Sequence, residues 1–296
     1  MKNEQISGWA LFRQSWGGAL ELMALKRRIF LPFGIIAAIE LLGILALFLL
    51  IQPPWVKYVQ PLVARFWGPA FLHYPLNLIL LMRLWYYFQI FVAAVLGTYM
   101  SALVMKAAEV FWQTKQIVLR QLILPLLRYY VGVLLIGLIV IGLVQWLGGI
   151  EEKILGKILR KGADFLGIAR KDWLLVFAVL GIGTAGFVQA VFAYVQPLFL
   201  LKNKNILSAF VINFRYFFKN WLPITALMLL PLLFYLPFAM ARARILDVMQ
   251  AAAPEIVFVL LLGSVLYSWV LNTFLTVAVT RMYLLLEGDE RGAGQR

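Results

Sequence analysis

The sequence predicts an all-α, polytopic membrane protein with about six transmembrane helices and additional interfacial amphipathic helices. Hydrophobic residues make up 64% of the 296 positions, against ~45–50% in soluble domains, and the mean hydropathy is +0.90. Long, nearly uncharged apolar segments recur along the chain, each close to the ~20 residues with which a helix crosses ~30 Å of hydrocarbon. The predicted spans are Ile29–Ile51, Leu84–Met105, Tyr129–Leu147, Leu174–Leu201, Trp221–Met240 and Ile256–Thr280.

Amphipathic segments precede the first, third and fifth spans. Gly8–Arg28 is predicted to form an N-terminal interfacial helix, because Trp9 and Trp16 belong to an apolar stripe at helical spacing. Ile206–Trp221 shows the clearest stripe, and Val110–Leu122 a weaker one. Amphipathic helices that are aromatic on one face and basic on the other lie well in the headgroup plane.

The same three spans open near Leu-Pro dipeptides, at Pro32, Pro125 and Pro223, each preceded by a basic residue. Proline is tolerated in the first turn of a helix, where its missing N–H would have no partner. One interpretation is a set of three two-span repeats. The alternative is that any six-span chain with even spacing shows this order. The polar segments are too short for a separate core, so residues 1–296 are predicted to form a single transmembrane domain.

The external loops are expected to differ from one another. Gln52–Met82 is rich in proline and aromatic residues, which predicts compact structure at the interface. Ile150–Lys171 is predicted to be a surface-lying amphipathic helix, whose charged face is either solvated or bound to a partner. More basic residues flank the side that carries both termini, and the positive-inside rule then places both in the cytoplasm, with a short tail at 287–296. No cleavable signal peptide is evident, so the first span is expected to remain as an anchor.

Composition excludes several kinds of chemistry. The chain has no cysteine and one histidine, His73, so neither a thiolate site nor a multi-histidine metal site is expected. Nucleotide-binding, hydrolase and metalloprotease motifs are also missing from the sequence. We therefore predict no catalytic residue, no metal and no cofactor. The net charge of +14 is attributed to contacts with anionic lipid and not with nucleic acid, since the basic residues lie mostly beside spans.

Glu40, near the middle of the first span, is the main candidate for an intramembrane functional group, because ionisable residues are expensive in hydrocarbon. One interpretation is that it carries protons or binds a cationic substrate. The alternatives are a neutral acid bonded to the backbone, or a structural ion pair, for which Arg83 is one candidate. Lys106 and Glu109, three apart on a helix, are predicted to form an interfacial pair.

Span four is the most polar, and it permits two interpretations. Gln189 and Gln196, with Asn272 of span six, either line a substrate path or bond across packed helices. Small residues at four-residue spacing are predicted to allow close helix packing, at Gly181, Ala185, Gly186 and Ala190.

Basic residues beside the spans are predicted to contact lipid headgroups, each contributing ~1 kcal/mol near an anionic surface. They are Arg27, Arg28, Arg120, Lys202, Lys204, Arg215 and Lys219.

The segment Gln196–Pro223 resembles a pattern in bacterial six-span inner-membrane proteins of the YciC-like type and in the membrane domain of some glycerophosphodiester phosphodiesterases. The matching positions are a polar turn at Leu200–Asn205, an amphipathic helix at Ala209–Arg215 and an aromatic–Lys–Asn–Trp junction at Phe217–Trp221. The resemblance implies a six-span architecture in a bacterial inner membrane. It carries over no catalytic residue, because the soluble catalytic domain is missing.

Two hypotheses about function follow from the sequence. The first is a non-catalytic scaffold or accessory subunit, which grips anionic lipid through basic amphipathic helices and binds other membrane proteins or further copies of itself. The second is a permease for a lipid or other amphiphile, with Glu40 as the binding or coupling acid. A membrane enzyme ranks third.

Overall fold

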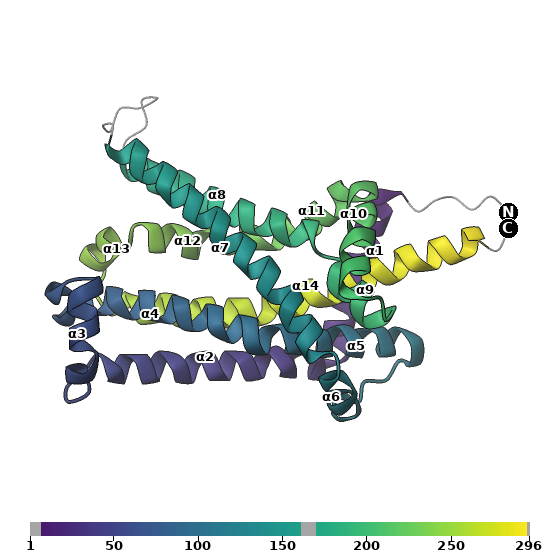
Figure 1. The fold of residues 1–296 in the computed structure, drawn as a ribbon, viewed down its shortest axis with the longest axis horizontal. Coiled ribbons are helices and arrows are strands. Elements are labelled where there is room, and N and C mark those ends of the chain that lie inside the picture. Colours follow the sequence, from purple (N-terminus) through teal and green to yellow (C-terminus); the bar gives the residue numbers. More distant parts are fainter. Residues whose placement is uncertain (1–6, 161–169, 295–296) are drawn as a thin grey trace.

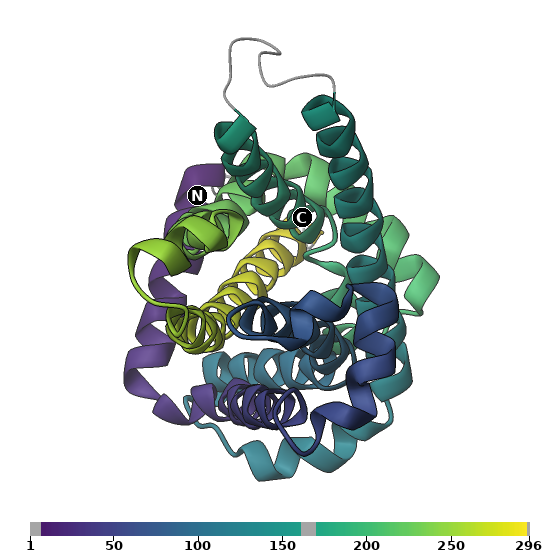
Figure 2. The same cartoon turned by 90° about the vertical axis from the view of Figure 1, so that its left-hand side faces the viewer.

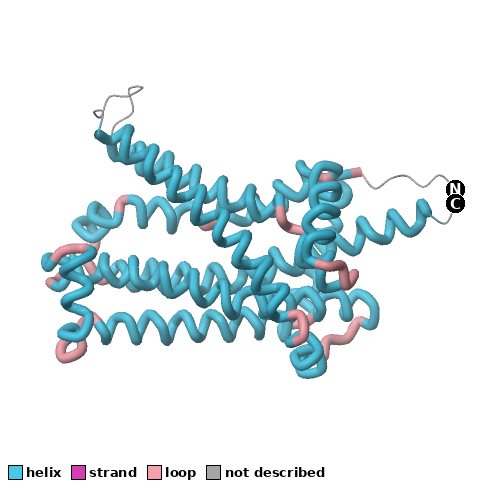
Figure 3. The backbone as a smooth tube through the Cα atoms, viewed as in Figure 1, coloured by secondary structure: helices cyan, strands magenta, loops and turns pink. Residues whose placement is uncertain are grey.

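The computed structural model describes residues 7–160 and 170–294, and these residues form helices joined by short loops, without a strand (Figures 1 and 3). Five helical stretches are long and apolar enough to cross a membrane: Arg27–Leu50, Leu76–Thr114, Tyr130–Ile158, Asp172–Leu201 and Ile256–Gly288. The prediction of an all-α polytopic protein is therefore confirmed. The predicted segments and the observed helices differ mainly in where each helix ends.

The first unit is a surface helix followed by a span. α1 (Gly8–Leu25) begins at Ser7, whose side chain accepts a hydrogen bond from the Ala10 amide at 3.2 Å. A short 3₁₀ turn, η1 (Arg27–Phe30), leads into α2 (Leu31–Leu50). Pro32 occupies the first turn of α2, as predicted. α3 (Val56–Phe66) and the 3₁₀ turn η2 (Pro69–Leu72) follow at the opposite end of the molecule (Figure 1).

The second span is much longer than the predicted Leu84–Met105. It begins as α4 (Leu76–Val92), passes through a π-helical turn, η3 (Ala93–Gly97), and continues as α5 (Thr98–Thr114). Because α4 begins at Leu76, the segment just before Arg83 is part of the helix and not loop, and Asn77 at its start is buried. A π turn inside an α-helix is rare and is frequent at functional sites.

Two predictions around the third span are wrong. The interfacial helix before it is α6 (Leu119–Leu127), whereas most of the predicted Val110–Leu122 segment closes α5 or lies in the connecting loop. Pro125 consequently lies inside α6 and not at the opening of a span. The span itself, α7 (Tyr130–Arg160), continues without a break through Gly148 and Gly149, so Ile150–Arg160 is not a separate surface helix. Residues 161–169 of that prediction lie outside the described residues.

The fourth span is α8 (Arg170–Val191), followed after a turn by α9 (Val195–Leu201). α10 (Ile206–Lys219) then begins at Asn205, whose side chain caps the Ser208 amide at 2.7 Å. α10 meets α11 (Trp221–Leu233) at 91°. α11 is too short to cross alone, and α12 (Leu236–Ala243) and α13 (Ile245–Ala251) follow it towards the end where α3 lies (Figure 1). The predicted fifth span, Trp221–Met240, is therefore interrupted at Phe234 and Tyr235.

The last helix, α14 (Ile256–Gly294), lies at the centre of the fold. It contacts α1, α2, α4, α5, α11, α12 and α13, and its residues Thr273–Thr280 are all buried. α1 crosses its far half, where Trp16 packs edge-on against Phe274 with ring centroids 4.7 Å apart. α1, α6 and α10 all lie at the end of the molecule at which α14 terminates (Figure 1). The order of surface helix followed by spans thus occurs three times along the chain.

Candidate functional site

Two adjoining cavities, of about 280 and 260 Å³, lie among the spans and share much of their lining, including Phe33, Gln189 and Asn272. We call them together the chamber. Its walls come from α2, the α4–η3–α5 helix, α7, α8, α9, α11 and α14. Each cavity is close to the lower end of the ~300–1,000 Å³ typical of ligand sites. All four residues predicted as an intramembrane polar site line the chamber: Glu40, Gln189, Gln196 and Asn272.

Glu40 is buried, with 5% of its surface exposed, on the side of α2 that faces the chamber. Its carboxyl group shares a hydrogen bond with the side chain of Gln89 on α4. Within residues 7–160 and 170–294 no basic side chain forms an ion pair with it, and the predicted alternative of a pair with Arg83 is not observed. Arg83 instead lies over the ring of Phe71, 5.4 Å from its centroid. A carboxyl group in this position is available to a proton or to a cationic ligand.

Carboxamide side chains supply most of the chamber's other polar groups. The Gln196 oxygen accepts a hydrogen bond from Ser101 at 3.1 Å, and Gln145 accepts one from Tyr86 at 2.7 Å. Gln189 and Asn272 are both exposed although they lie within spans. Amide groups that face hydrocarbon are costly, whereas the same groups facing a cavity can bind water or a ligand.

The chamber contains residues that the sequence analysis did not single out. Gln89 and Gln145 lie inside apolar segments and meet the same criterion that identified Gln189, so the signal was present. Gly137 carried no such signal. A Cβ atom at this position would lie 2.0 Å from Thr98 Cγ2, so α7 approaches α5 this closely only because residue 137 is glycine. Gly137 and Thr98 both line the chamber.

The small residues of span four lie on faces of α8 that pack against different neighbours. A Cβ atom at Gly186 would lie 2.5 Å from Leu229 of α11, and Ala190 is fully buried. A Cβ atom at Gly181 would lie 3.5 Å from Glu151 of α7, and Ala185 is half-buried. Gln189 comes four residues after Ala185 and three after Gly186, so it lies on α8 between the two small-residue pairs, and it lines the chamber. Both interpretations of this span therefore apply to adjacent positions on one helix.

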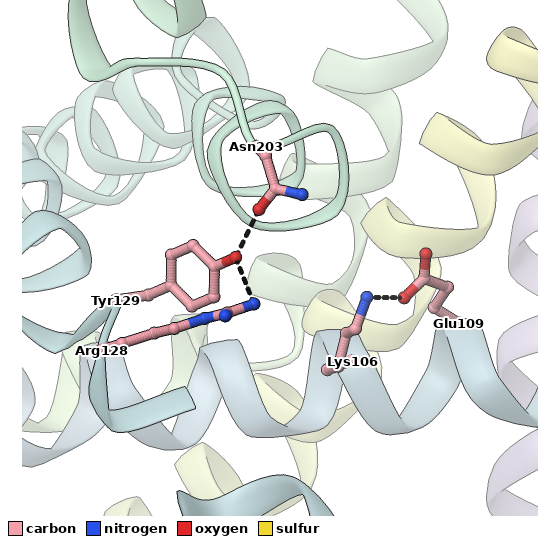
Figure 4. A network of polar contacts seen from close by, with 5 residues as sticks. All are labelled: Lys106, Glu109, Arg128, Tyr129 and Asn203. Atoms are coloured by element: carbon pink, nitrogen blue, oxygen red, sulfur yellow. Dashed lines mark hydrogen bonds and ion pairs between the residues drawn. The ribbon is translucent and has the colours of Figure 1, made fainter. Parts of the chain in front are cut away.

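The lining of the chamber ends on α5 at Met105. Beyond this residue, towards the end of the molecule that holds α6 and α10, polar contacts connect segments near the surface (Figure 4). Lys106 and Glu109 form the predicted pair, with a distance of 2.5 Å from Nζ to the carboxylate oxygen. Arg128 donates to the Tyr129 hydroxyl at 2.8 Å, and that hydroxyl donates to Asn203 in the turn between α9 and α10. This network links the start of α7 to the turn before α10.

Most of the basic residues predicted to contact headgroups are exposed at this same end of the molecule. Lys202 differs from the others, because its Nζ lies 3.5 Å from a carboxylate oxygen of Glu287 on α14. The exposed members are Arg27, Arg28, Arg120, Lys204, Arg215 and Lys219.

Polar links also join the helices at the opposite end. Arg244 after α12 forms an ion pair with Asp172 of α8 at 2.8 Å. Tyr74, before α4, donates to Glu255, before α14, at 2.9 Å. That hydrogen bond to the carboxylate raises the pKa of Tyr74 above its ordinary value, because ionised tyrosine could no longer donate and would repel Glu255.

No group of three histidine, aspartate or glutamate side chains with the spacing of a metal site occurs in the described part of the chain. No protein-family model, curated protein or solved structure matches this chain. The resemblance of Gln196–Pro223 to YciC-like proteins stays a prediction. The candidate function accordingly depends on the chamber and its residues.

Proposed function

We propose that this protein is a permease that moves an amphiphilic molecule through the membrane by way of the chamber, with Glu40 as its binding or coupling acid. The observation that carries the proposal is the convergence of Glu40, Gln89, Gln189 and Asn272 on one cavity inside the spans. Packing alone would favour amides bonded to neighbouring helices, yet Gln189 and Asn272 expose their side chains inside the spans. An apolar wall with a few convergent polar groups suits a ligand that is itself partly apolar.

We place the protein in a bacterial cytoplasmic membrane with both termini in the cytoplasm. The basic residues at the end that holds the termini support this orientation, through the positive-inside rule.

The central test is transport by Glu40→Gln in proteoliposomes. The substitution keeps the shape of the side chain and its hydrogen bond to Gln89 but removes the charge and the titratable proton. We expect uptake of a fluorescent amphiphile to fall at least tenfold, while folding and lipid retention stay unchanged. Glu21→Gln is the matched control, because Glu21 is an exposed carboxylate on α1 away from the chamber. Unchanged transport by Glu40→Gln would contradict the proposed role of this acid.

A second measurement asks whether the chamber is open to water-soluble reagents. The sequence has no cysteine, so a thiol reagent would react only with a cysteine that is introduced on purpose. Cysteine at Gln189 or Asn272 is expected to react with a charged thiol reagent. Cysteine at Leu138 or Leu266, which are exposed on the outside of the spans, is expected to resist it. Equal protection at all four positions would argue against a permeation path.

A scaffold or accessory role is the second candidate, and α10 is the observation that favours it. This helix exposes Leu207, Val211 and Phe218 beside the basic residues Arg215 and Lys219, as a lipid-gripping helix would. The charge reversals Lys204→Glu, Arg215→Glu and Lys219→Glu test this role. If it holds, they abolish co-purification of stoichiometric partners and of anionic lipid.

A further inference from the structure

A third cavity, of about 570 Å³, opens at the end of the molecule opposite the termini. It lies between α4, α7 and the junction of α12 with α13, and Figure 2 views the molecule from this end. Its charged lining residues are Arg83, Glu152 and Arg242. We call this cavity the outer cleft. None of these three residues lines the chamber.

The two arginines of the outer cleft present unused hydrogen-bond donors. The Arg242 guanidinium stacks over Trp85, 4.9 Å from the ring centroid, and donates to Ser264 at 2.8 Å, while its buried Nε has no partner. Arg83 is exposed and lies over Phe71. Across the described ranges neither arginine forms an ion pair. A guanidinium carries five donors in a planar fork that matches the oxygens of a phosphate, so both side chains suit such a group.

The same cleft holds one carboxylate that is not paired with either arginine. Glu152 lines it from α7, at a distance beyond that of an ion pair. Two cations and one anion, held apart in one cavity, match a ligand that carries both a phosphate and an ammonium group. The remaining lining includes Ile79, Met82 and Ile245, which offer an apolar surface to a hydrocarbon chain.

We infer that the outer cleft binds the headgroup of an amphiphile with a phosphate diester and a primary amine, the phosphate lying between Arg83 and Arg242 and the amine at Glu152. This inference rests on the proposed function, because it names the class of substrate that the permease takes. One hydrogen bond joins the linings of the cleft and the chamber: Tyr86 lines the cleft and donates its hydroxyl hydrogen to Gln145, which lines the chamber.

The test is binding of a lyso-phosphatidylethanolamine, measured by native mass spectrometry or by tryptophan quenching, with inorganic phosphate as competitor. Arg83→Gln is expected to weaken binding at least tenfold. Arg242→Lys keeps the charge but loses the planar fork, and it is expected to weaken binding severalfold. A lysine is chosen because a neutral residue at this position could prevent folding. Arg65→Gln is the matched control, since Arg65 is an exposed arginine of α3 that does not line the cleft. Glu152→Gln should weaken binding of the amine-bearing lipid but not of lyso-phosphatidylglycerol.

The possible outcomes separate the inference from the proposed function. Equal binding by Arg83→Gln and Arg65→Gln would overturn the inference. If inorganic phosphate at the same concentration as the lipid displaced the lipid completely, the outer cleft would be a site for free phosphate. This result would also overturn the inference. Glu40→Gln is expected to retain binding at the cleft while losing transport. If the unmodified protein bound the lipid through Arg83 but transported no amphiphile, the inference about the outer cleft would hold and the proposed permease function would be wrong.

Discussion

At the scale of single residues, Gly137 determines how closely α7 approaches α5 beside the chamber. Its Cβ would lie 2.0 Å from Thr98 Cγ2, far inside the contact distance of two non-bonded carbon atoms. Gly137→Ala therefore has to displace the Thr98 side chain or push the two helices apart, and overpacking of this kind costs ~1–3 kcal/mol. We expect a matching loss of stability, measured as the midpoint of thermal unfolding in detergent, and altered access of thiol reagents to the chamber.

Two further variants show whether this contact is the cause. Thr98→Ser removes the methyl group that the new Cβ would meet, so Gly137→Ala with Thr98→Ser should recover most of the lost stability. Gly142→Ala is the control on the same helix, because no atom lies within 4 Å of its Cβ position. If Gly142→Ala lowered the stability by a comparable amount, the cause would be alanine in α7 in general and not the contact between Gly137 and α5.

At the scale of secondary-structure elements, α10 has three faces where the sequence pattern predicts two. Ala209, Asn213, Tyr216 and Phe217 are buried against the protein. A second apolar stripe is exposed, and it includes Leu207 at 80% and Phe218 at 70% of full exposure. Arg215 and Lys219 occupy the strip between these faces. Three such faces are typical of a helix that lies in the membrane surface and contacts protein, hydrocarbon and water.

The arrangement of α10 predicts opposite environments for residues on its two outer faces. Spin labels at cysteines replacing Leu207 and Phe218 are expected to collide more often with dissolved oxygen, which concentrates in hydrocarbon. Labels at Ser208 and Lys219 are expected to collide more often with a water-soluble nickel chelate. If all four labels favoured the nickel chelate, α10 would not lie against the membrane.

The helices could be predicted from the sequence, whereas their ends and rotations could not. Apolar length predicts a span because the hydrocarbon has a fixed thickness, so α2 agrees well with its predicted segment. α14 begins at the predicted Ile256 but continues beyond the predicted Thr280 to Gly294. The same criterion ends α7 too early, because the charged residues from Glu151 onwards extend the helix beyond the apolar run. In the chamber, isolated polar residues such as Glu40 were predictable. Gly137 was not, because its role depends on Thr98, which is distant in sequence and adjacent only in the fold.

At the scale of the whole molecule, the number of crossings follows from where the surface helices lie. α1 and the last turns of α14 lie at one end, whereas α3 and α13 lie at the other (Figure 1). Each crossing carries the chain from one end to the other, so a chain whose two termini share an end crosses an even number of times. Five stretches qualify as spans on length alone. We therefore predict that the α11–α12 segment provides a sixth crossing, although its helix is interrupted at Phe234 and Tyr235.

Single cysteines at exposed glutamines test this topology, with an impermeant thiol reagent applied to intact cells. Gln60 on α3 and Gln250 on α13 are expected to be labelled directly, because both lie at the end away from the termini. Gln14 on α1 and Gln113 near the end of α5 should be labelled only after permeabilisation, since the basic residues at their end favour the cytoplasm. Labelling of Gln60 but not of Gln250 would mean that α11 and α12 do not cross. The reverse pattern for all four glutamines would keep the six crossings and invert the protein in the membrane.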